Sequence, residues 1–145
     1  SLACDFRIVT KCAQLSLPEM KIGMIPGSGG SVRLARMIGL SRVKDMIMRG
    51  KRISGEEAFN WGLASELVEK DKLEITISKL VNELCSVSPL AQRAIKTVLN
   101  TSQDAPLHVA IELEGETYGR LRSSDDFNEG GKSFVEKRKP VYKGK

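Results

Sequence analysis

The sequence predicts an α/β chain in which a few short strands are followed by a helical region. Short apolar runs that suit strands are confined to about the first 70 residues. From residue 71 onward, apolar side chains recur at helical spacing, and capping residues divide them into separate helices. A chain with so few strands fits part of a larger fold better than a self-contained α/β domain. We therefore expect two regions, residues 1–70 and residues 71–145.

The first region has four short runs that are candidates for extended chain. Residues 6–10, FRIVT, alternate in polarity and include β-branched side chains, which is typical of a strand. Residues 13–17 form a second strand that ends at Pro18, and residues 22–25 are a third short apolar run. Residues 63–68 are again strand-like. The sequence therefore predicts three or four short strands.

Helices between these runs are predicted from their caps. A glycine-rich stretch leads into helical spacing over residues 32–38. Ser41 is the expected N-cap of a helix over residues 43–48. Ser54 and Glu57 fit a capping box, in which a serine and a glutamate three residues apart satisfy the first N–H groups of a helix. We expect a short helix to begin there.

The second region is predicted to contain four helices. Residues 73–85 place apolar side chains on one face. The pair Ser88–Pro89 supplies an N-cap and a first-turn proline for a helix that runs to about residue 100. A third helix is expected over about residues 106–122, and the pair Ser124–Asp125 offers a cap for a last one that continues through residues 134–137.

Composition and charge exclude few function classes. The chain is 41% hydrophobic and 28% charged, as expected for a globular protein, and its sparse aromatic residues predict an aliphatic core. Much of the net charge of +5 comes from residues 132–145. Such a surface suits nucleic acid, an anionic membrane or a phosphate-bearing ligand. The basic end lacks interleaved aromatic residues and a known nucleic-acid motif, so no nucleic-acid partner is expected.

The cysteines and the hydropathy indicate a reducing compartment. Cys4, Cys12 and Cys85 are odd in number and lack disulfide or metal-ligand spacing, so we expect small buried hydrophobic residues. No apolar run approaches the ~20 residues that span a membrane, and no membrane insertion is expected. The chain does not open with a signal peptide.

No metal site is expected. His108, the sole histidine, has no partner at ligand spacing, and we expect it to have no chemical role. Asp125 and Asp126 are better placed as helix caps than as metal ligands.

Glu19 is the first candidate for chemistry. It follows Pro18, whose ring stiffens the backbone, and apolar neighbours could desolvate it. Desolvation raises the pKa of a glutamate, which allows it to act as a general acid at neutral pH. Composition alone favours the alternative of an exposed loop glutamate, since carboxylates are rarely buried.

The loop Gly27-Ser28-Gly29-Gly30 is the second candidate. Glycine-rich loops before a helix can bind anions through backbone N–H groups. This loop lacks the Lys-Ser/Thr ending of a Walker A motif, and Val32 replaces the last glycine of a GxGxxG motif. We therefore favour a structural role, in which a tight turn packs close to the segment of Glu19.

Phe134 and Lys137 are the third candidate. They lie three residues apart, so on a helix they would share a face. A flat ring beside an ammonium group suits an adenine with an adjacent phosphate. The alternative, which the residues alone favour, is a core phenylalanine and a solvated lysine.

Residues 17–34, LPEMKIGMIPGSGGSVRL, resemble the signature region of the crotonase superfamily, the enoyl-CoA hydratases and isomerases. The resemblance continues in the family's order and spacing along the rest of the chain, at residues 3–5, 50–54, 57–58, 62–63 and 134–140. It implies the crotonase-like fold, a ββα spiral. Family members are considerably longer, so the resemblance implies the C-terminal portion of that fold, with Ser1 partway along a helix.

The resemblance implies an enoyl-CoA hydratase, which reversibly adds water to a 2-enoyl-CoA to give a 3-hydroxyacyl-CoA. In the family, the glutamate at the position of Glu19 exchanges a proton with the carbon next to the thioester carbonyl. Two backbone N–H groups from the preceding half stabilise the thioester oxygen, and hydratases carry a second glutamate that would fall just before Ser1. The alternatives are an enoyl-CoA isomerase of the same family and a non-catalytic oligomerising fragment.

The resemblance also implies the site and the partners. Glu19 is the expected catalytic residue. The expected substrate-binding residues are Pro18, Gly27, Gly29, Gly30, Phe134 and Lys137, the last two near the CoA adenine. No cofactor is expected, because CoA is part of the acyl-CoA substrate. Residues 71–145 are expected to contribute to a homotrimer or hexamer, and the 145 residues alone are expected to be inactive. The expected location is the cytoplasm, or the mitochondrial matrix if a targeting segment precedes Ser1.

Overall fold

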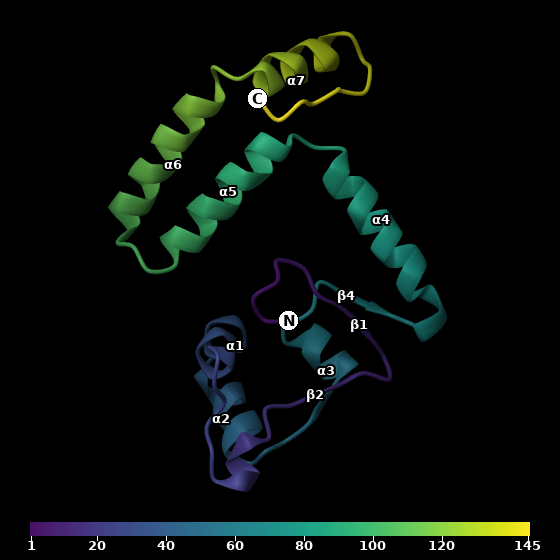
Figure 1. Ribbon diagram of the computed structural model, residues 1–145, viewed down its shortest axis with the longest axis vertical. Helices are drawn as coiled ribbons and strands as arrows, with labels where there is room; N and C mark the ends of the chain where they lie inside the picture. Colours follow the sequence, from purple (N-terminus) through teal and green to yellow (C-terminus); the bar gives the residue numbers. More distant parts are fainter. The chain divides into compact units, whose positions relative to one another are not determined.

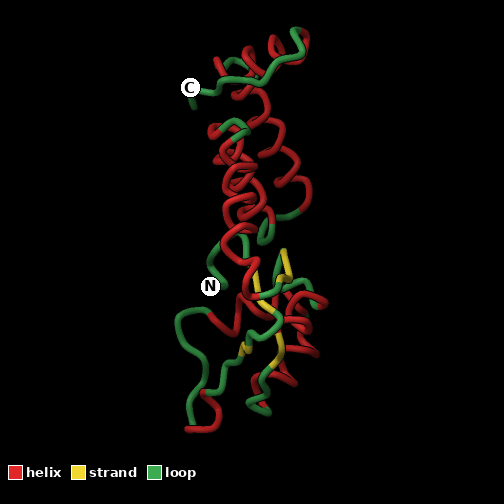
Figure 2. Tube along the Cα trace, turned by 90° about the vertical axis from the view of Figure 1, so that its right-hand side faces the viewer, coloured by secondary structure: helices red, strands yellow, loops and turns green.

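The computed structural model describes residues 1–145, which form two units, residues 1–78 and residues 79–145. Figure 2 shows that all the strands belong to the first unit, whereas the second consists of helices and loops. Helix α4, Leu73–Cys85, contains the boundary between the units. The predicted order of short strands followed by helices is therefore confirmed.

The strands of the first unit form two small sheets. β1 (Ile8–Thr10) pairs in parallel with β4 (Glu66–Val68), and β2 (Gln14–Leu15) pairs antiparallel with β3 (Ile53–Ser54). Val9, in the middle of β1, is buried and lies opposite Leu67. β1, β2 and β4 lie within the predicted runs of residues 6–10, 13–17 and 63–68 but are shorter, because the backbone pairing covers only two or three residues in each. β3 was not predicted.

The apolar run of residues 22–25 is not a strand, so the expectation of extended chain there is wrong. Residues Glu19–Ile22 form a 3-10 helix, η1, that ends at Gly23. Gly23 has a φ of 75°, a left-handed conformation that glycine adopts without strain. The N–H of Met24 then donates to the carbonyl of Glu19 at 3.1 Å, so this segment closes on itself instead of pairing with a strand.

Two helices of the first unit supply most of its core. α1 (Gly30–Ile38) and α2 (Leu40–Met48) pack against each other, and Gly39 lies between them as the C-cap of one and the N-cap of the other. Ser41 lies inside α2, so the expectation that Ser41 is the N-cap is wrong. The buried residues form one aliphatic cluster: Leu34, Ile38, Val43, Met46, Ile47, Ile53, Ala58 and Leu63.

Helix α3 (Gly55–Asn60) begins with the predicted capping box. The N–H of Glu57 donates to Ser54 Oγ at 3.1 Å, and the N–H of Ser54 donates to Glu57 Oε2 at 2.9 Å. These two bonds satisfy backbone N–H groups at the start of the helix, which have no partner within it. The predicted cap is therefore confirmed.

The second unit is built from helices that follow the sequence prediction closely. A short 3-10 turn, η2 (Lys70–Lys72), precedes α4, and after α4 come α5 (Pro89–Ser102), α6 (Leu107–Leu121) and α7 (Asp125–Val135). Ser88 caps α5, as predicted, by accepting a hydrogen bond from the N–H of Ala91. α5 and α6 lie side by side (Figure 1). None of the helices is both long and apolar enough to cross a lipid bilayer.

All three cysteines are exposed, so the expectation that they are small buried residues is wrong. Cys4 and Cys12 lie in a bend and a turn near the sheet strands, and Cys85 is the last residue of α4. Each occupies a place where the chain changes direction at the surface. The buried positions are filled by leucine, isoleucine, valine, methionine and alanine instead.

Candidate functional site

Glu19 lies at the start of a rigid turn. It is the first residue of η1, and Pro18 precedes it as the N-cap. The N–H of Lys21 donates to the carbonyl of Pro18 at 2.9 Å, and the N–H of Met24 donates to the carbonyl of Glu19 at 3.1 Å. Both ends of the turn are therefore fixed by backbone hydrogen bonds, and the Cα position of Glu19 is fixed with them.

One carboxylate oxygen of Glu19 is buried without a hydrogen-bond partner. The side chain is half-buried, and its Oε2 atom is buried without a hydrogen-bond partner within the protein. A buried polar atom left unpaired costs about 1–3 kcal/mol, and most such atoms in folded proteins have a partner. Glu19 is therefore not the solvent-exposed loop glutamate of the alternative interpretation. Its unpaired oxygen can accept a proton from, or return one to, a group placed beside it.

The glycine loop next to Glu19 is a tight turn. The N–H of Gly30 donates to the carbonyl of Gly27 at 3.1 Å, and Ser28 and Gly29 have φ values of 54° and 80°. A Cβ on Gly30 would lie 3.5 Å from the side chain of Leu17, two residues before Glu19. The loop therefore packs on the segment that carries the carboxylate, as the structural interpretation of these glycines predicted.

The glycines of this loop are not equivalent. Gly29 adopts a left-handed conformation, and a Cβ there would come within 2.4 Å of the Arg33 guanidinium. Gly27 has neither feature: its φ is not in the left-handed region, and no atom lies within 4 Å of an added Cβ. The local structure thus explains why glycine occupies positions 29 and 30. It gives no reason for a glycine at position 27.

Arg33 is a residue of this loop that the sequence prediction missed. Its Nη1 donates to the carbonyl of Ser28 at 2.9 Å, so the side chain reaches back from the first turn of α1 and holds the loop. The sequence does show a basic residue one turn into a helix that follows a glycine loop. Its partner, however, is a backbone carbonyl, and every residue type carries one, so the sequence does not identify the contact.

Phe134 and Lys137 do not share a helix face, so that expectation is wrong. α7 ends at Val135, and Lys137 has a φ of 53°. The N–H of Lys137 donates to the carbonyl of Phe134 at 3.3 Å, and the N–H of Arg138 donates to the carbonyl of Ser133 at 3.1 Å. This pair of bonds is a Schellman motif with lysine at the left-handed position. Phe134 is 84% exposed, which excludes the alternative of a core phenylalanine.

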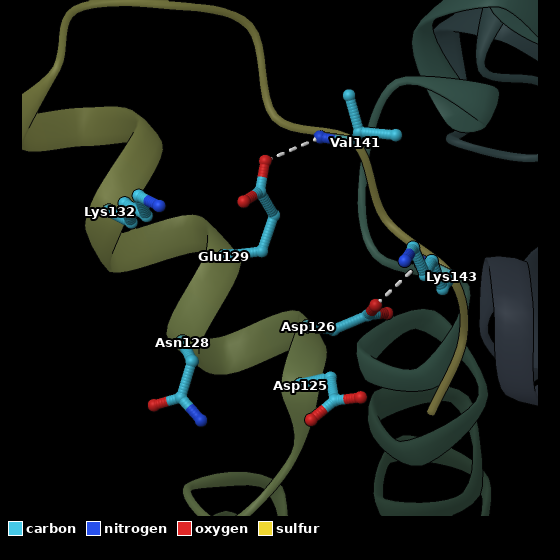
Figure 3. A pocket seen from close by; sticks show the side chains of 7 residues that line it. All are labelled: Asp125, Asp126, Asn128, Glu129, Lys132, Val141 and Lys143. Atoms are coloured by element: carbon cyan, nitrogen blue, oxygen red, sulfur yellow. Dashed lines mark hydrogen bonds between the residues drawn. The ribbon is translucent and has the colours of Figure 1, made fainter.

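Beyond this motif, the chain returns along α7 as a C-terminal strap, residues 139–145 (Figure 3). A hollow of about 300 Å³ lies between α7 and the strap, lined by Asp125, Asp126, Asn128, Glu129, Lys132, Val141 and Lys143. Glu129 accepts a hydrogen bond from the N–H of Val141 at 2.8 Å, and Asp126 accepts one from the N–H of Lys143 at 2.8 Å. Two carboxylates of one helix therefore bind the strap.

These bonds lower the pKa values of both carboxyl groups. The Arg138 guanidinium and, next, the N–H of Val141 hold the pKa of Glu129 at about 2, well below its usual range. The hydrogen bond from Ser88 Oγ, at 2.6 Å, is the largest cause that lowers the pKa of Asp126. Asp126 is only 4% exposed. The position of Asp126 in the sequence predicted a helix cap, and this prediction is wrong. Ser124 is the N-cap of α7, because its Oγ accepts the N–H of Phe127.

The two groups of predicted site residues belong to different units. Glu19 and the glycine loop are in residues 1–78, and Phe134 and Lys137 are in residues 79–145. No group of three or more histidine, cysteine, aspartate or glutamate side chains is arranged to hold a metal ion. His108 is exposed near the start of α6.

Comparisons with known proteins identify the family. The sequence profile of the Enoyl-CoA hydratase/isomerase family matches residues 1–145. Methylglutaconyl-CoA hydratase 1, mitochondrial, of Pyricularia oryzae is 37% identical over 169 aligned residues, which cover 100% of this chain and 46% of that protein. Carnitinyl-CoA dehydratase of Salmonella agona is 34% identical, over 100% of this chain and 57% of that protein.

Solved structures agree. The 1.8 Å crystal structure of enoyl-CoA hydratase from Bacillus anthracis matches with a TM-score of 0.96 and 38% identity, over 99% of this chain and 56% of that one. The chain belongs to the enoyl-CoA hydratase/isomerase family, and its fold is the crotonase fold that the resemblance implied. The chain spans about half the length of the curated relatives it matches.

Proposed function

We propose that these residues form part of an enoyl-CoA hydratase in which Glu19 transfers the proton. The observation that carries the proposal is the buried, unpaired Oε2 of Glu19 on a turn that backbone hydrogen bonds fix. The relatives are named as a hydratase and a dehydratase of CoA compounds, and these names support addition or removal of water. The proposed reaction is reversible hydration of a 2-enoyl-CoA to a 3-hydroxyacyl-CoA.

The proposed role of Glu19 follows from its position. Its carboxyl group exchanges a proton with the carbon next to the thioester carbonyl, and the hydrogen-bonded turn fixes the backbone from which the carboxylate extends. Pro18 and the glycines at 27, 29 and 30 shape the adjacent acyl site. The thioester oxygen is stabilised by two backbone N–H groups outside residues 1–145, each contributing on the order of 3 kcal/mol. The reaction requires no separate cofactor, because CoA arrives with the substrate.

We propose that Phe134 and Lys137 contact the nucleotide end of the substrate. Phe134 offers an almost fully exposed ring for an adenine, and Lys137 offers an ammonium group for a phosphate. The backbone supports a ligand role for Lys137. A non-glycine residue at a left-handed position is strained, and such strain is found where the side chain has a function.

The test of Glu19 is steady-state kinetics of the complete protein with a short 2-enoyl-CoA. Glu19→Gln keeps the shape of the side chain and removes the proton exchange, so kcat should fall by ~10²–10⁴ with little change in KM. The matched control is Glu74→Gln, an exposed glutamate at the start of α4, which should leave both constants unchanged. A loss of less than a few-fold in kcat for Glu19→Gln removes Glu19 from the mechanism.

The same kinetics separate the two reactions of the family. Assaying a 3-enoyl-CoA for conversion into the 2-enoyl isomer, beside hydration of the 2-enoyl-CoA, shows which substrate is turned over faster. Faster isomerisation would replace the hydratase proposal with the isomerase.

The test of Lys137 is calorimetric titration of the complete protein with CoA. Lys137→Asn is the preferred variant, because asparagine tolerates the left-handed backbone and carries no charge. CoA binding should weaken by about 0.5–2 kcal/mol, and the loss should shrink as salt rises. Pantetheine, which lacks the nucleotide, should bind equally well to both proteins. Equal losses for both ligands would contradict a nucleotide contact.

We also propose that the complete protein is a homotrimer or hexamer to which residues 71–145 contribute. The many exposed apolar side chains of α4, α5 and α6 support this, since monomeric proteins rarely expose large contiguous apolar surfaces. Light scattering tests it, and a monomeric mass at micromolar concentration would contradict it.

A further inference from the structure

The C-terminal strap is attached to α7 at two separate points. At the far point, Asp126 Oδ1 accepts hydrogen bonds from the N–H groups of Lys143 at 2.8 Å and Gly144 at 3.0 Å, and the N–H of Asp126 donates to the carbonyl of Lys145. At the near point, Glu129 Oε1 accepts the N–H of Val141. Figure 3 shows both carboxylates directed from α7 toward the strap.

The near point also includes Arg138. Its Nη1 and Nη2 donate to the two oxygens of Glu129 at 2.5 and 2.9 Å, a bidentate ion pair. Its Nε donates to Glu136 Oε2 at 2.6 Å. Paired bonds between a planar guanidinium and a carboxylate fix direction as well as distance. The side chain of Arg138 is therefore held in one orientation by two glutamates that precede it in the chain.

Lys137 is the residue just before Arg138, whose side chain binds Glu129 and Glu136. It follows Glu136 and precedes Arg138, and its own backbone is in the strained left-handed conformation. An unconstrained lysine would leave that conformation readily, because the left-handed region is unfavourable for residues other than glycine. The side-chain bonds of Arg138, together with the Schellman bond from its own N–H to the carbonyl of Ser133, keep the turn closed.

We propose that Glu129 and Arg138 are positioning residues for the nucleotide end of the CoA thioester. They act through Lys137, by keeping its backbone in the left-handed conformation. This inference rests on the proposed contact between Lys137 and CoA. Asp126 does not have the same role, because its bonds join the far end of the strap to Ser88, at the N-cap of α5.

The rival explanation is that Glu129 and Arg138 only stabilise the strap. The two explanations differ in what a variant does to different ligands. A purely structural role changes the stability of the second unit and affects CoA and pantetheine alike. A positioning role weakens CoA specifically, and only while Lys137 is present.

The experiment compares ligand affinities of the complete protein by calorimetry. Glu129→Gln keeps the size of the side chain and an acceptor for the N–H of Val141, but it removes the charge that pairs with Arg138. It should weaken CoA binding by about threefold to tenfold and leave pantetheine binding unchanged. Ser88→Ala is the matched control: it removes the donor to Asp126 at the far attachment point and should leave both affinities unchanged.

A double variant tests the route of the effect. If Glu129 acts through Lys137, adding Glu129→Gln to Lys137→Asn should cause no further loss of CoA affinity. A full additional loss, or equal losses for CoA and pantetheine, overturns the positioning role. The positioning role is also overturned if Glu129→Gln binds CoA as tightly as the unsubstituted protein while Lys137→Asn binds it more weakly. Lys137→Asn that binds CoA as well as the unsubstituted protein overturns the nucleotide contact itself, and the positioning role with it.

Discussion

Gly55 allows a decisive test of the packing between β1 and α3. It is buried at the first position of α3, and its N–H donates to the carbonyl of Ala13 at 2.9 Å. A Cβ at this position would lie 2.0 Å from the carbonyl oxygen of Thr10 and 3.0 Å from its carbonyl carbon. Both are backbone atoms, so no side-chain rotation can relieve the contact.

The substitution Gly55→Ala should destabilise the first unit. Helix propensity alone favours alanine over glycine by up to about 1 kcal/mol. Against this, the Thr10 carbonyl must retreat by about 1 Å or more. That movement disturbs its hydrogen bond from the N–H of Ala13 at 3.0 Å and the end of the pairing between β1 and β4. Overpacking of a well-packed core costs about 1–3 kcal/mol, so we expect a net loss of about 2 kcal/mol.

Urea unfolding of the chain, followed by the fluorescence of Trp61, measures the effect. Trp61 is the only tryptophan, and it packs against the core of the first unit. The matched control is Gly119→Ala in α6 of the second unit, where no atom lies within 4 Å of an added Cβ, and it should not lower the urea midpoint reported by Trp61. A Gly55→Ala chain that unfolds at the same or a higher urea concentration than the unsubstituted chain would refute the reasoning.

Four further outcomes are expected. Ser54→Ala removes the capping box and should lower the free energy of unfolding by about 1 kcal/mol in the same titration; an unchanged midpoint would contradict the cap. Hydrogen bonds in the folded state lower the pKa of Glu129 to about 2. Its contribution to stability should therefore be complete above about pH 4.5 and should be lost as the pH falls toward 2. Glu129→Gln should flatten that part of the plot of unfolding midpoint against pH. Arg42→Ala removes a guanidinium 5.2 Å from the Trp61 ring centroid and should shift its emission while costing no more than about 1 kcal/mol; an unchanged spectrum would argue against the contact. The 145 residues alone should not hydrate a short enoyl-CoA, and turnover well above a blank in the absorbance assay would overturn the view that further parts of the fold are required.

Local sequence patterns predicted the helix starts at which both capping partners lie in one short segment. The capping box at Ser54 and Glu57 and the start of α5 at Ser88 were predictable because each involves residues three apart, so one short segment contains both partners. The bounds of α4 follow from its apolar spacing in the same way. Glu19 was identifiable because its motif is continuous in the sequence.

The same local reasoning failed where a turn replaced regular structure. The apolar run of residues 22–25 has strand-like composition, but Gly23 provides a left-handed turn and no strand pairs with the run. Phe134 and Lys137 have helical spacing, but the helix ends between them, with a lysine where glycine is usual. Only the second ending lacks the residue type that usually marks it.

Sequence alone therefore determined the succession of short strands and then helices, the caps of α3 and α5, and the candidate carboxylate. The tertiary structure decided which groups meet: the unpaired Oε2 of Glu19, the Arg33 contact with the glycine loop, and the attachment of the strap to α7. The hydrogen bonds between the strap and α7 join residues 12 to 19 positions apart through backbone N–H groups. Every residue except proline carries a backbone N–H, so the sequence holds no specific mark for such a partner, and only the folded chain brings a particular carboxylate to it.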